Sequence, residues 1–265
     1  MPGAYDRSRN AAVVRQISAN FDSAISDFFG TRAPNREAAQ GAHDAYVAAL
    51  RAHGTDVTVL PALDEYPDCC FVEDTAVMVN GKAIIPNMGH PSREGEQVAV
   101  AEHLSSSAEI INMPKGAKLD GGDVVFFDDR YLIGVSTRTN RAGADFLASH
   151  VREDGLECEF IDIPNSTLHL TTVCSSPRPG MIIAAEGHLT ASQLEPLAED
   201  VVWVPNRESY AANTIGYKGD RAIIADGFPV VRQTMLDEGF KITSVDMKEI
   251  MQADGSLTCL SVFNA

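Results

Sequence analysis

Hydrophobic and polar positions along the chain follow a recurring order of elements. Two short apolar segments, residues 75–79 and 82–86, flank Asn80-Gly81, the dipeptide most typical of a tight β-hairpin. The next segment, "SREGEQVAVAEHLS", begins with the N-cap candidate Ser92 and predicts a helix. "EIINMP", from Glu109, predicts a third strand. The unit is therefore a hairpin, a helix and a strand, or ββαβ.

The same order returns along the rest of the chain. In the second copy the segments are "DVVFF-DD-RYLIGVS", "TNRAGADFLASHV" and "CEFIDIP"; in the third, "TTVCSSPRPGMIIAAE", "TASQLEPLAE" and "VVWVP"; in the fourth, "NTIGY-KGD-RAIIAD", "PVVRQTMLDEG" and "KITSVDM". Thr190 and Gln193 in the third copy have the spacing of a helix capping box. A fifth copy closes only if the chain ends join: "TCLSVFN" with "AAVVRQ", then "NREAAQGAHDAYVAALRAHG" and "DVTVLPA".

These copies begin near residues 74, 122, 170, 212 and 258, a period of roughly 42 to 48 residues that is typical of radial or stacked repeats. The pattern predicts an α/β fold: a closed, five-bladed ββαβ propeller formed by one domain, residues 1–265, with its active site on the central axis. An ordinary doubly wound sheet is the alternative. It is less favoured because such a sheet alternates single strands with helices, whereas here a hairpin precedes each helix.

Composition narrows the function classes. The formal net charge of −16 argues against nucleic acid as a partner, because that ligand requires clustered Lys and Arg. The sequence has no apolar leader and no run of eighteen apolar residues, so a cytoplasmic protein without membrane segments is expected. Its seven histidines lack metal-ligand spacing and no phosphate-binding glycine motif occurs, so neither a metal nor a cofactor is predicted. Five cysteines without CxxC spacing are expected to be free thiols.

Unusual polar residues occur where the copies begin. They are Glu73 and Asp74, Asp120, His169, Asn213, and Cys259. Because equivalent positions of a pseudo-symmetric ring converge on its axis, these side chains are expected to lie close together in space. No specific role is predicted for Asn213.

Each of these residues has a structural explanation when it is taken alone. Cys259 could pack as a small apolar side chain, since free cysteines are commonly buried. His169 could be a core histidine bound to backbone, and Asp120 could shape the Gly-Gly turn that follows it. Because all of these residues occur at the same position of the repeat, a shared catalytic role is favoured over separate structural roles.

The chemistry that this set supports is nucleophilic catalysis on a cation. A Cys259 thiolate would attack, His169 would act as general acid and base, and Asp120 would orient the imidazole. Glu73 and Asp74 beside the thiol call for a positively charged ligand. A guanidinium fits, because its planar fork matches carboxylates.

The residues also resemble a known family. The segments "PDCCFVEDTAV", "PSRE", "LDGGDVVFFDDRYLIGVSTRTN", "LHLTTVCS" and "DGSLTCLSV" resemble the dimethylarginine dimethylaminohydrolase family of the guanidine-modifying superfamily, in the same order over nearly the whole chain. The resemblance implies a five-bladed ββαβ propeller. It also implies hydrolysis of Nω-methylated arginine to citrulline and a methylamine, through a covalent thiouronium on Cys259.

Further roles follow from the resemblance alone. Arg93 and Arg138 would hold the substrate α-carboxylate and Asp68 its α-ammonium, while the carbonyl of Ala253 would contact the guanidinium end. An N-terminal lid is expected within "ISANFDSAISDFF", residues 17–29. One departure is Leu260, which stands where some members carry a second cysteine.

Two other readings remain open at this point. An arginine deiminase or an amidinotransferase shares the cysteine, the histidine and the acids, and differs in the pocket around the leaving nitrogen. A non-catalytic amino-acid-binding ring is less favoured, because binding alone requires neither His169 nor Asp120. The oligomeric state is left open, a homodimer included.

Overall fold

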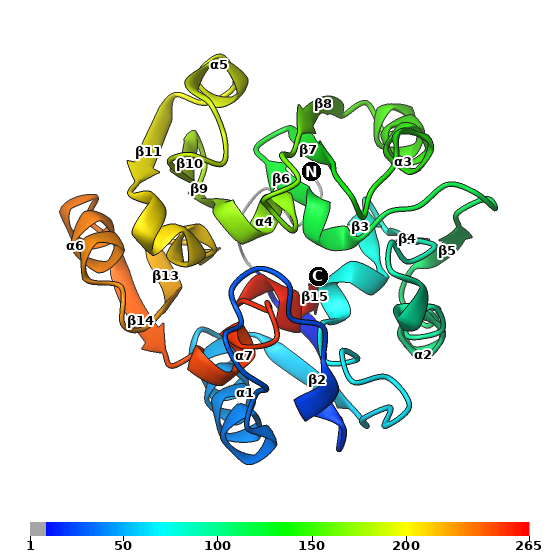
Figure 1. Cartoon of the computed structure of the whole chain (residues 1–265). Helices are drawn as coiled ribbons and strands as arrows, with labels where there is room; N and C mark the ends of the chain where they lie inside the picture. The colour runs from blue at the N-terminus through cyan, green and yellow to red at the C-terminus, as the bar shows by residue number, and fades with distance from the viewer. Residues whose placement is uncertain (1–8, 265) are drawn as a thin grey trace.

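Five three-stranded sheets, one for each predicted repeat, surround a common axis in the computed structural model, which describes residues 9–264 (Figure 1). In each sheet an antiparallel strand pair leads through a helix to a third strand that pairs in parallel with the second; the pair is a hairpin in four sheets and joins the two chain ends in the fifth. The strand pairs, inner strand first, are β3 (Val77–Val79) and β4 (Lys82–Ile85), β6 (Val124–Phe127) and β7 (Arg130–Val135), β9 (Cys174–Arg178) and β10 (Met181–Ala185), β12 (Ile215–Tyr217) and β13 (Arg221–Ala225), and β15 (Val262–Phe263) and β1 (Ala11–Arg15). The third strands are β5 (Glu109–Asn112), β8 (Glu157–Asp162), β11 (Asp200–Val204), β14 (Lys241–Val245) and β2 (Asp56–Leu60). The predicted five-bladed ββαβ propeller is confirmed.

The two ends of the chain close the ring, as the pattern predicted. Strand β1 pairs antiparallel with β15, with Val13 opposite Val262, and in parallel with β2. The backbone N–H of Asn264 donates to the carbonyl of Ala11 at 3.1 Å. In Figure 1 the blue and red ends of the colour scale therefore meet in one blade.

The connecting helices lie around the outside of the ring (Figure 1). They are α2 (Gln97–Leu104), α3 (Arg141–Glu153), α5 (Ala191–Leu194), α6 (Pro229–Asp237) and α1 (Arg36–Ala52). Asn35 caps α1 by accepting from the backbone N–H of Ala38 at 2.9 Å, and the predicted capping box of α5 is present. None of the described helices is both long and apolar enough to cross a bilayer.

The prediction that Ser92 caps a continuous helix is wrong. Residues Pro91–Arg93 form a separate 3-10 turn, η4, and α2 begins only at Gln97. Gly95, at φ +115°, separates the two in a conformation that favours glycine. The interruption brings Arg93 and Glu96 into the interior, where they pair with each other.

A short helical segment, of one turn except in the kinked segment before β12, precedes each inner strand. These segments are η3 (Val72–Thr75), η5 (Gly121–Asp123), α4 (Leu170–Val173), η6 (Asn206–Ala212) and η7 (Thr258–Leu260); two further short helices are η2 (Phe21–Ser23) and α7 (Lys248–Met251). The interpretation of "TCLSVFN", the first strand of the fifth copy, as a continuous strand is therefore wrong at its start, since Cys259 lies in η7 and the strand is limited to Val262–Phe263. In η7 the N–H of Ser261 bonds locally to Thr258, which removes it from the sheet ladder.

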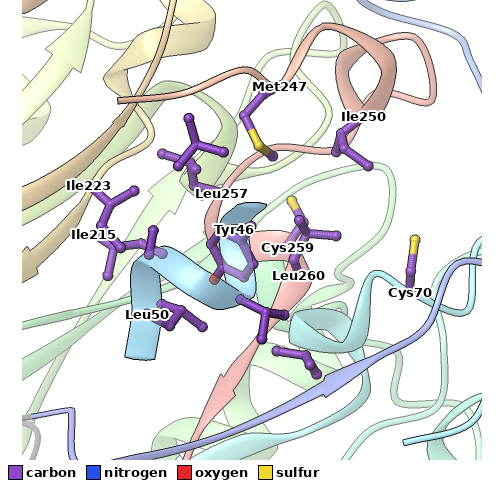
Figure 2. Packing of buried hydrophobic residues seen from close by; sticks show 14 of the residues in the cluster. Tyr46, Leu50, Cys70, Ile215, Ile223, Met247, Ile250, Leu257, Cys259 and Leu260 are labelled. Carbon is purple, nitrogen blue, oxygen red and sulfur yellow. The ribbon is translucent and has the colours of Figure 1, made fainter. Parts of the chain in front are cut away.

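Apolar side chains between the sheets and the outer helices form the core. One cluster joins Tyr46 and Leu50 of α1 to Leu257 and Leu260 on either side of Cys259 (Figure 2). Leu257 and Leu260 are fully buried, and each such leucine stabilises the fold by about 2 kcal/mol. The turn that carries Cys259 is thus anchored in the core of the fifth blade.

Candidate active site

The one-turn helices bring the polar residues of the repeats to a small cavity on the axis. It encloses about 30 Å³ and is lined by Ile25, Asp68, Phe71, Asp74, Arg93, Arg138, Leu168, His169, Ala253, Asp254, Gly255 and Cys259. Gly122 permits this close approach: a Cβ there would lie 2.7 Å from His169 Nδ1 and 2.9 Å from Asp74 Oδ1. Of the residues singled out in the sequence, Glu73 and Asn213 do not line this cavity, and Asp120 reaches it through His169.

His169 is held between carboxylates. Its Nε2 lies 3.1 Å from Asp120 Oδ2 and its Nδ1 lies 3.9 Å from Asp74 Oδ1. Asp120 is fixed in turn by the backbone N–H of Gly89, which donates to Oδ1 at 2.7 Å. Burial lowers the pKa of His169, but the surrounding carboxylates outweigh it and raise the pKa to about 9. The imidazole is therefore protonated at neutral pH and can act as an acid.

Asp74 is oriented by a buried arginine. Arg93 Nη1 donates to Asp74 Oδ2 at 2.5 Å, while its Nε and Nη2 bond to Glu96 and Nη2 also donates to the carbonyl of Phe71. The other Asp74 oxygen accepts from Gly122 N–H at 2.9 Å. Since a guanidinium has five N–H groups, these bonds leave one Nη1 hydrogen of Arg93 for a ligand, counted over the described residues. Arg93 therefore also positions a carboxylate, which the sequence did not indicate.

Cys259 is a buried thiol in an anionic setting. Its side chain is 6% exposed and its Sγ lies 3.5 Å from the hydroxyl of Ser256. Burial, followed by the charges of Glu73 and Asp74, raises the pKa of this thiol far above its ordinary value. Without a cation beside it, Cys259 is a neutral thiol at neutral pH.

Glu73 faces away from the small cavity although it neighbours Asp74 in sequence. Its Oε2 accepts from the hydroxyls of Thr258 at 2.9 Å and Thr171 at 3.3 Å, and it lines a second, larger cavity. Burial and then the charge of Asp74 raise its pKa to about 7. Glu73 and Asp74, the two acids predicted to bind the guanidinium, therefore lie on opposite sides of the layer of helical turns that separates the two cavities.

The residues expected to bind the amino-acid end gather at one side of the small cavity. Arg138, in the loop after β7, has its Nη1 3.7 Å from Asp120 Oδ2. Asp68 is 5% exposed and accepts from the backbone N–H of Ile25 at 3.1 Å. Ala253 is buried in the cavity wall. Burial, the largest effect, raises the pKa of Asp68, partly offset by the charge of Arg93.

Among the residues that the sequence did not single out, Ile25, Asp254 and Glu96 shape this site. Ile25 is the apolar side chain of the N-terminal segment that reaches the cavity, and the expected range, residues 17–29, contained it. Asp254 accepts from backbone N–H groups of the same segment, including Phe29 at 2.6 Å and Gly30 at 3.1 Å. Glu96 supports Arg93. No local pattern identifies the last two, because their partners are set by tertiary contact.

Asn213 joins two of the turns. Its Nδ2 donates to the carbonyl of Thr171 at 2.7 Å and to Thr258 Oγ1 at 2.9 Å, and its Oδ1 accepts from the Thr258 N–H at 3.0 Å. This residue is buried and lies one residue before Thr214, at the start of the fourth blade. It therefore fixes the turn that carries Cys259 relative to the turn after His169.

One group in the site has metal-ligand geometry. Asp74, Asp120 and His169 each offer a ligand atom, and these atoms lie within 4.8 Å of one another. The guanidinium groups of Arg93 and Arg138 lie beside the same two carboxylates and compete with a cation for them. The sequence had shown no such spacing, because the three residues come from different blades.

The fold and the site together define the class: a ββαβ ring with cysteine, histidine and carboxylates at its axis is the architecture of the guanidine-modifying superfamily. A family model described as "N,N dimethylarginine dimethylhydrolase, eukaryotic" matches residues 14–263. The chain belongs to the dimethylarginine dimethylaminohydrolase family.

Individual relatives agree with this assignment. The N(G),N(G)-dimethylarginine dimethylaminohydrolase of Pseudomonas aeruginosa is 30% identical over 83% of this chain and 86% of its own length. A structure of a variant of the Pseudomonas aeruginosa protein complexed with citrulline has a TM-score of 0.89 at 26% identity, covering 96% of this chain and 98% of that one. Another structure of a dimethylarginine dimethylaminohydrolase, an adduct with S-methyl-L-thiocitrulline, has a TM-score of 0.88 at 26% identity, with the same coverage.

The deiminase alternative has weaker support. An arginine deiminase of Rhodococcus erythropolis is 29% identical over 46% of this chain and 32% of its own length. The match covers under half of this chain, whereas the dimethylarginine family model covers residues 14–263.

Proposed function

We propose that this protein hydrolyses Nω-methylated arginine to citrulline and dimethylamine or methylamine. The observation that carries the proposal is the shared cavity: Cys259 and His169 line it together with Asp74, in a chain of the dimethylarginine dimethylaminohydrolase family. The reaction uses no metal and no cofactor, because a thiol, an imidazole and water supply every group it needs.

The substrate is bound at both ends. Asp74 binds the guanidinium in the cavity and Glu73 adds negative charge from the other side of the layer of helical turns, while the Ala253 carbonyl accepts from the guanidinium N–H groups. At the other end Arg138 and the remaining Nη1 hydrogen of Arg93 bind the α-carboxylate, and Asp68 binds the α-ammonium. Opposite charges at the two ends orient the substrate so that its guanidinium carbon faces the sulfur.

Substrate binding activates the nucleophile. The pKa of Cys259 is raised by burial and by the acids beside it, so the free enzyme holds a thiol. A bound guanidinium neutralises those acids and places a positive charge next to the sulfur, which favours the thiolate. The thiol is therefore ionised when its substrate is present.

The reaction then proceeds in two balanced steps. The Cys259 thiolate forms a bond to the guanidinium carbon, the carbon–nitrogen bond to the methylated nitrogen breaks, and His169 gives that nitrogen a proton. Water then adds to the carbon of the cationic thiouronium and gives one proton to His169; the carbon–sulfur bond breaks as the remaining hydroxyl proton passes to the sulfur, leaving citrulline and the Cys259 thiol. Asp120 stabilises the imidazolium that precedes each proton donation.

The N-terminal segment acts as the lid. The cavity of about 30 Å³ has room for a water molecule or two but not for an amino acid. Ile25 is held over it by the hydrogen bond from its N–H to Asp68. Entry of the substrate therefore requires Ile25 to move, and the incoming α-ammonium takes its place on Asp68.

The reducing cytoplasm is the compartment that we propose for this chain. Cys259 must stay a free thiol to react, and Cys69, Cys70, Cys158 and Cys174 are free as well.

A comparison of substrates tests the proposal. Citrulline formation is measured as kcat/KM for asymmetric dimethylarginine, monomethylarginine and arginine, with wild-type protein and with Cys259→Ser and His169→Gly. Wild-type protein should prefer the methylated substrates, and both variants should lose activity by about a thousandfold or more. Preference for plain arginine would make the protein a deiminase, and full activity in both variants would exclude the thiol mechanism.

A further inference from the structure

A second cavity lies on the same axis, behind the active site. It has a volume of about 510 Å³ and runs from the exposed turn Asn80-Gly81 to the group Glu73, Thr171 and Thr258, in which Thr171 is buried and the other two residues are half-buried. No step of the hydrolysis described above uses this space. Its inner end is polar, since a carboxylate and two hydroxyl groups meet there.

A single layer of helical turns separates this rear cavity from the active site. Asp74 lines the active site and the preceding residue, Glu73, lines the rear cavity. In the same way, Cys259 lines the active site and the preceding residue, Thr258, lines the rear cavity. In the third blade His169 lines the active site and Thr171 the rear cavity. The reacting groups are therefore one or two residues away from a solvent-connected space.

The chemistry requires such a space while the front entrance is blocked. After the first step the citrulline-forming part of the substrate is bonded to Cys259 and fills the narrow front cavity beneath Ile25. At that moment a small amine must leave the carbon and a water molecule must reach it. A leaving amine becomes an ammonium ion, which the Glu73 carboxylate attracts, and hydroxyl groups conduct water where apolar side chains would exclude it.

We propose that the rear cavity is the path by which the methylamine product leaves and the hydrolytic water enters, with the group Glu73, Thr171 and Thr258 as its inner gate. The proposal rests on the hydrolase function above and adds a route to it. Citrulline leaves at the front, past Ile25, so the two products take opposite exits.

Filling the rear cavity at a distance from the gate tests the route. Val124 and Met78 are half-buried residues of its wall on inner strands β6 and β3. The series is Val124→Phe, Val124→Trp and the double variant with Met78→Trp. Val98→Trp, on the exposed surface of α2, is the matched control. Each variant is first checked for its circular dichroism spectrum and Tm.

Turnover and the covalent intermediate are then measured with dimethylarginine. We expect kcat to fall progressively along the series, by about tenfold or more in the double variant. Intact-protein mass spectrometry of quenched samples should show a growing fraction of Cys259 thiouronium. Citrulline binding, measured by calorimetry, should stay unchanged. Folded variants with wild-type kcat and no added intermediate would overturn the route.

A second experiment, in which added methylamine reacts with the covalent intermediate in place of water, tests the route if the double variant fails to fold. With methylamine added, wild-type protein should convert part of the dimethylarginine to monomethylarginine, because methylamine replaces water in the second step and the carbon–sulfur bond breaks as the carbon–nitrogen bond forms. Val124→Phe should lower this capture relative to Val98→Trp, and equal capture would contradict the route. If the wild-type protein forms no citrulline at all, the proposed function fails instead.

Discussion

At the scale of single residues, the neighbours Glu73 and Asp74 show how surroundings separate two similar side chains. Asp74 accepts from an arginine and a backbone N–H, whereas the donors to Glu73 within residues 9–264 are hydroxyl groups. Burial and the charge of Asp74 therefore leave the pKa of Glu73 at about 7. Ionisation of the Glu73 carboxyl group therefore costs little free energy only when a cation lies beside it.

The raised pKa of Glu73 predicts the pH dependence of stability. Between pH 4.5, its ordinary pKa, and about 7, the folded state holds a proton that the unfolded chain releases. The free energy of unfolding therefore falls as pH rises through this window. Glu73→Gln, which cannot ionise, should have the Tm of the wild type at pH 4.5 and a Tm higher by roughly 2–4 °C at pH 8.

The measurement is thermal unfolding of the ligand-free proteins across this pH range. Glu94→Gln, on the exposed surface beside η4, is the control and should follow the wild type at every pH. A constant difference in Tm between Glu73→Gln and the wild type would contradict the assigned pKa.

At the scale of elements, the proposed lid has no regular structure after η2, and side chains of a distant turn hold it in place. Asp254, which is 4% exposed, accepts from four consecutive backbone N–H groups, those of residues 27–30. Gln252 accepts from the next, Thr31, at 2.9 Å. Because the same turn contains Ala253 in the cavity wall, the lid and the site share one support.

Asp254→Asn should release this segment. The amide has one acceptor oxygen instead of two and places N–H groups against backbone N–H groups, so some donors lose their partner at about 1–3 kcal/mol each. We expect KM for dimethylarginine to rise about tenfold, and amide hydrogen exchange over residues 25–31 to become faster. Asp27→Asn, exposed on the same segment, is the control. Unchanged exchange would show that the lid does not depend on Asp254.

At the scale of the whole molecule, the ring depends on two short strands from opposite ends of the chain. Val13 and Val262 are both buried where β1 meets β15, and Cys259 lies three residues before Val262. The position of Cys259 and the closure of the ring are therefore coupled.

Removal of residues 262–265 should abolish both the closure of the ring and the correct placement of Cys259. The change deletes β15 and exposes the edge of β1, so we expect the loss of cooperative unfolding and a fall in citrulline formation of about a hundredfold or more. Removal of Ala265 alone is the control. Circular dichroism melting and a citrulline assay measure the two effects, and an active truncated protein would show that closure is not required.

Much of the architecture could be predicted from the sequence, because strands, turns and helices follow local rules. Asn80-Gly81 indicated a hairpin, Thr190 with Gln193 a helix start, and the repeated order predicted five blades. The pseudo-symmetry also predicted that Cys259, His169 and Asp120 meet at the axis. Local rules failed at Ser92 and at the start of "TCLSVFN", where a buried ion pair and the contacts of the site outweigh local propensity.

By itself, the sequence determined the blade order, the closure by the chain ends and the phase at which reactive residues occur, since each depends on pattern and spacing. Only the tertiary structure decided which cavity each side chain lines and which partners it contacts. Glu73 and Asp74 are adjacent in sequence but line different cavities. Arg93 donates most of its N–H groups to Asp74 and Glu96. Charge, burial and hydrogen-bond partners arise from residues of other blades, and no local pattern contains them.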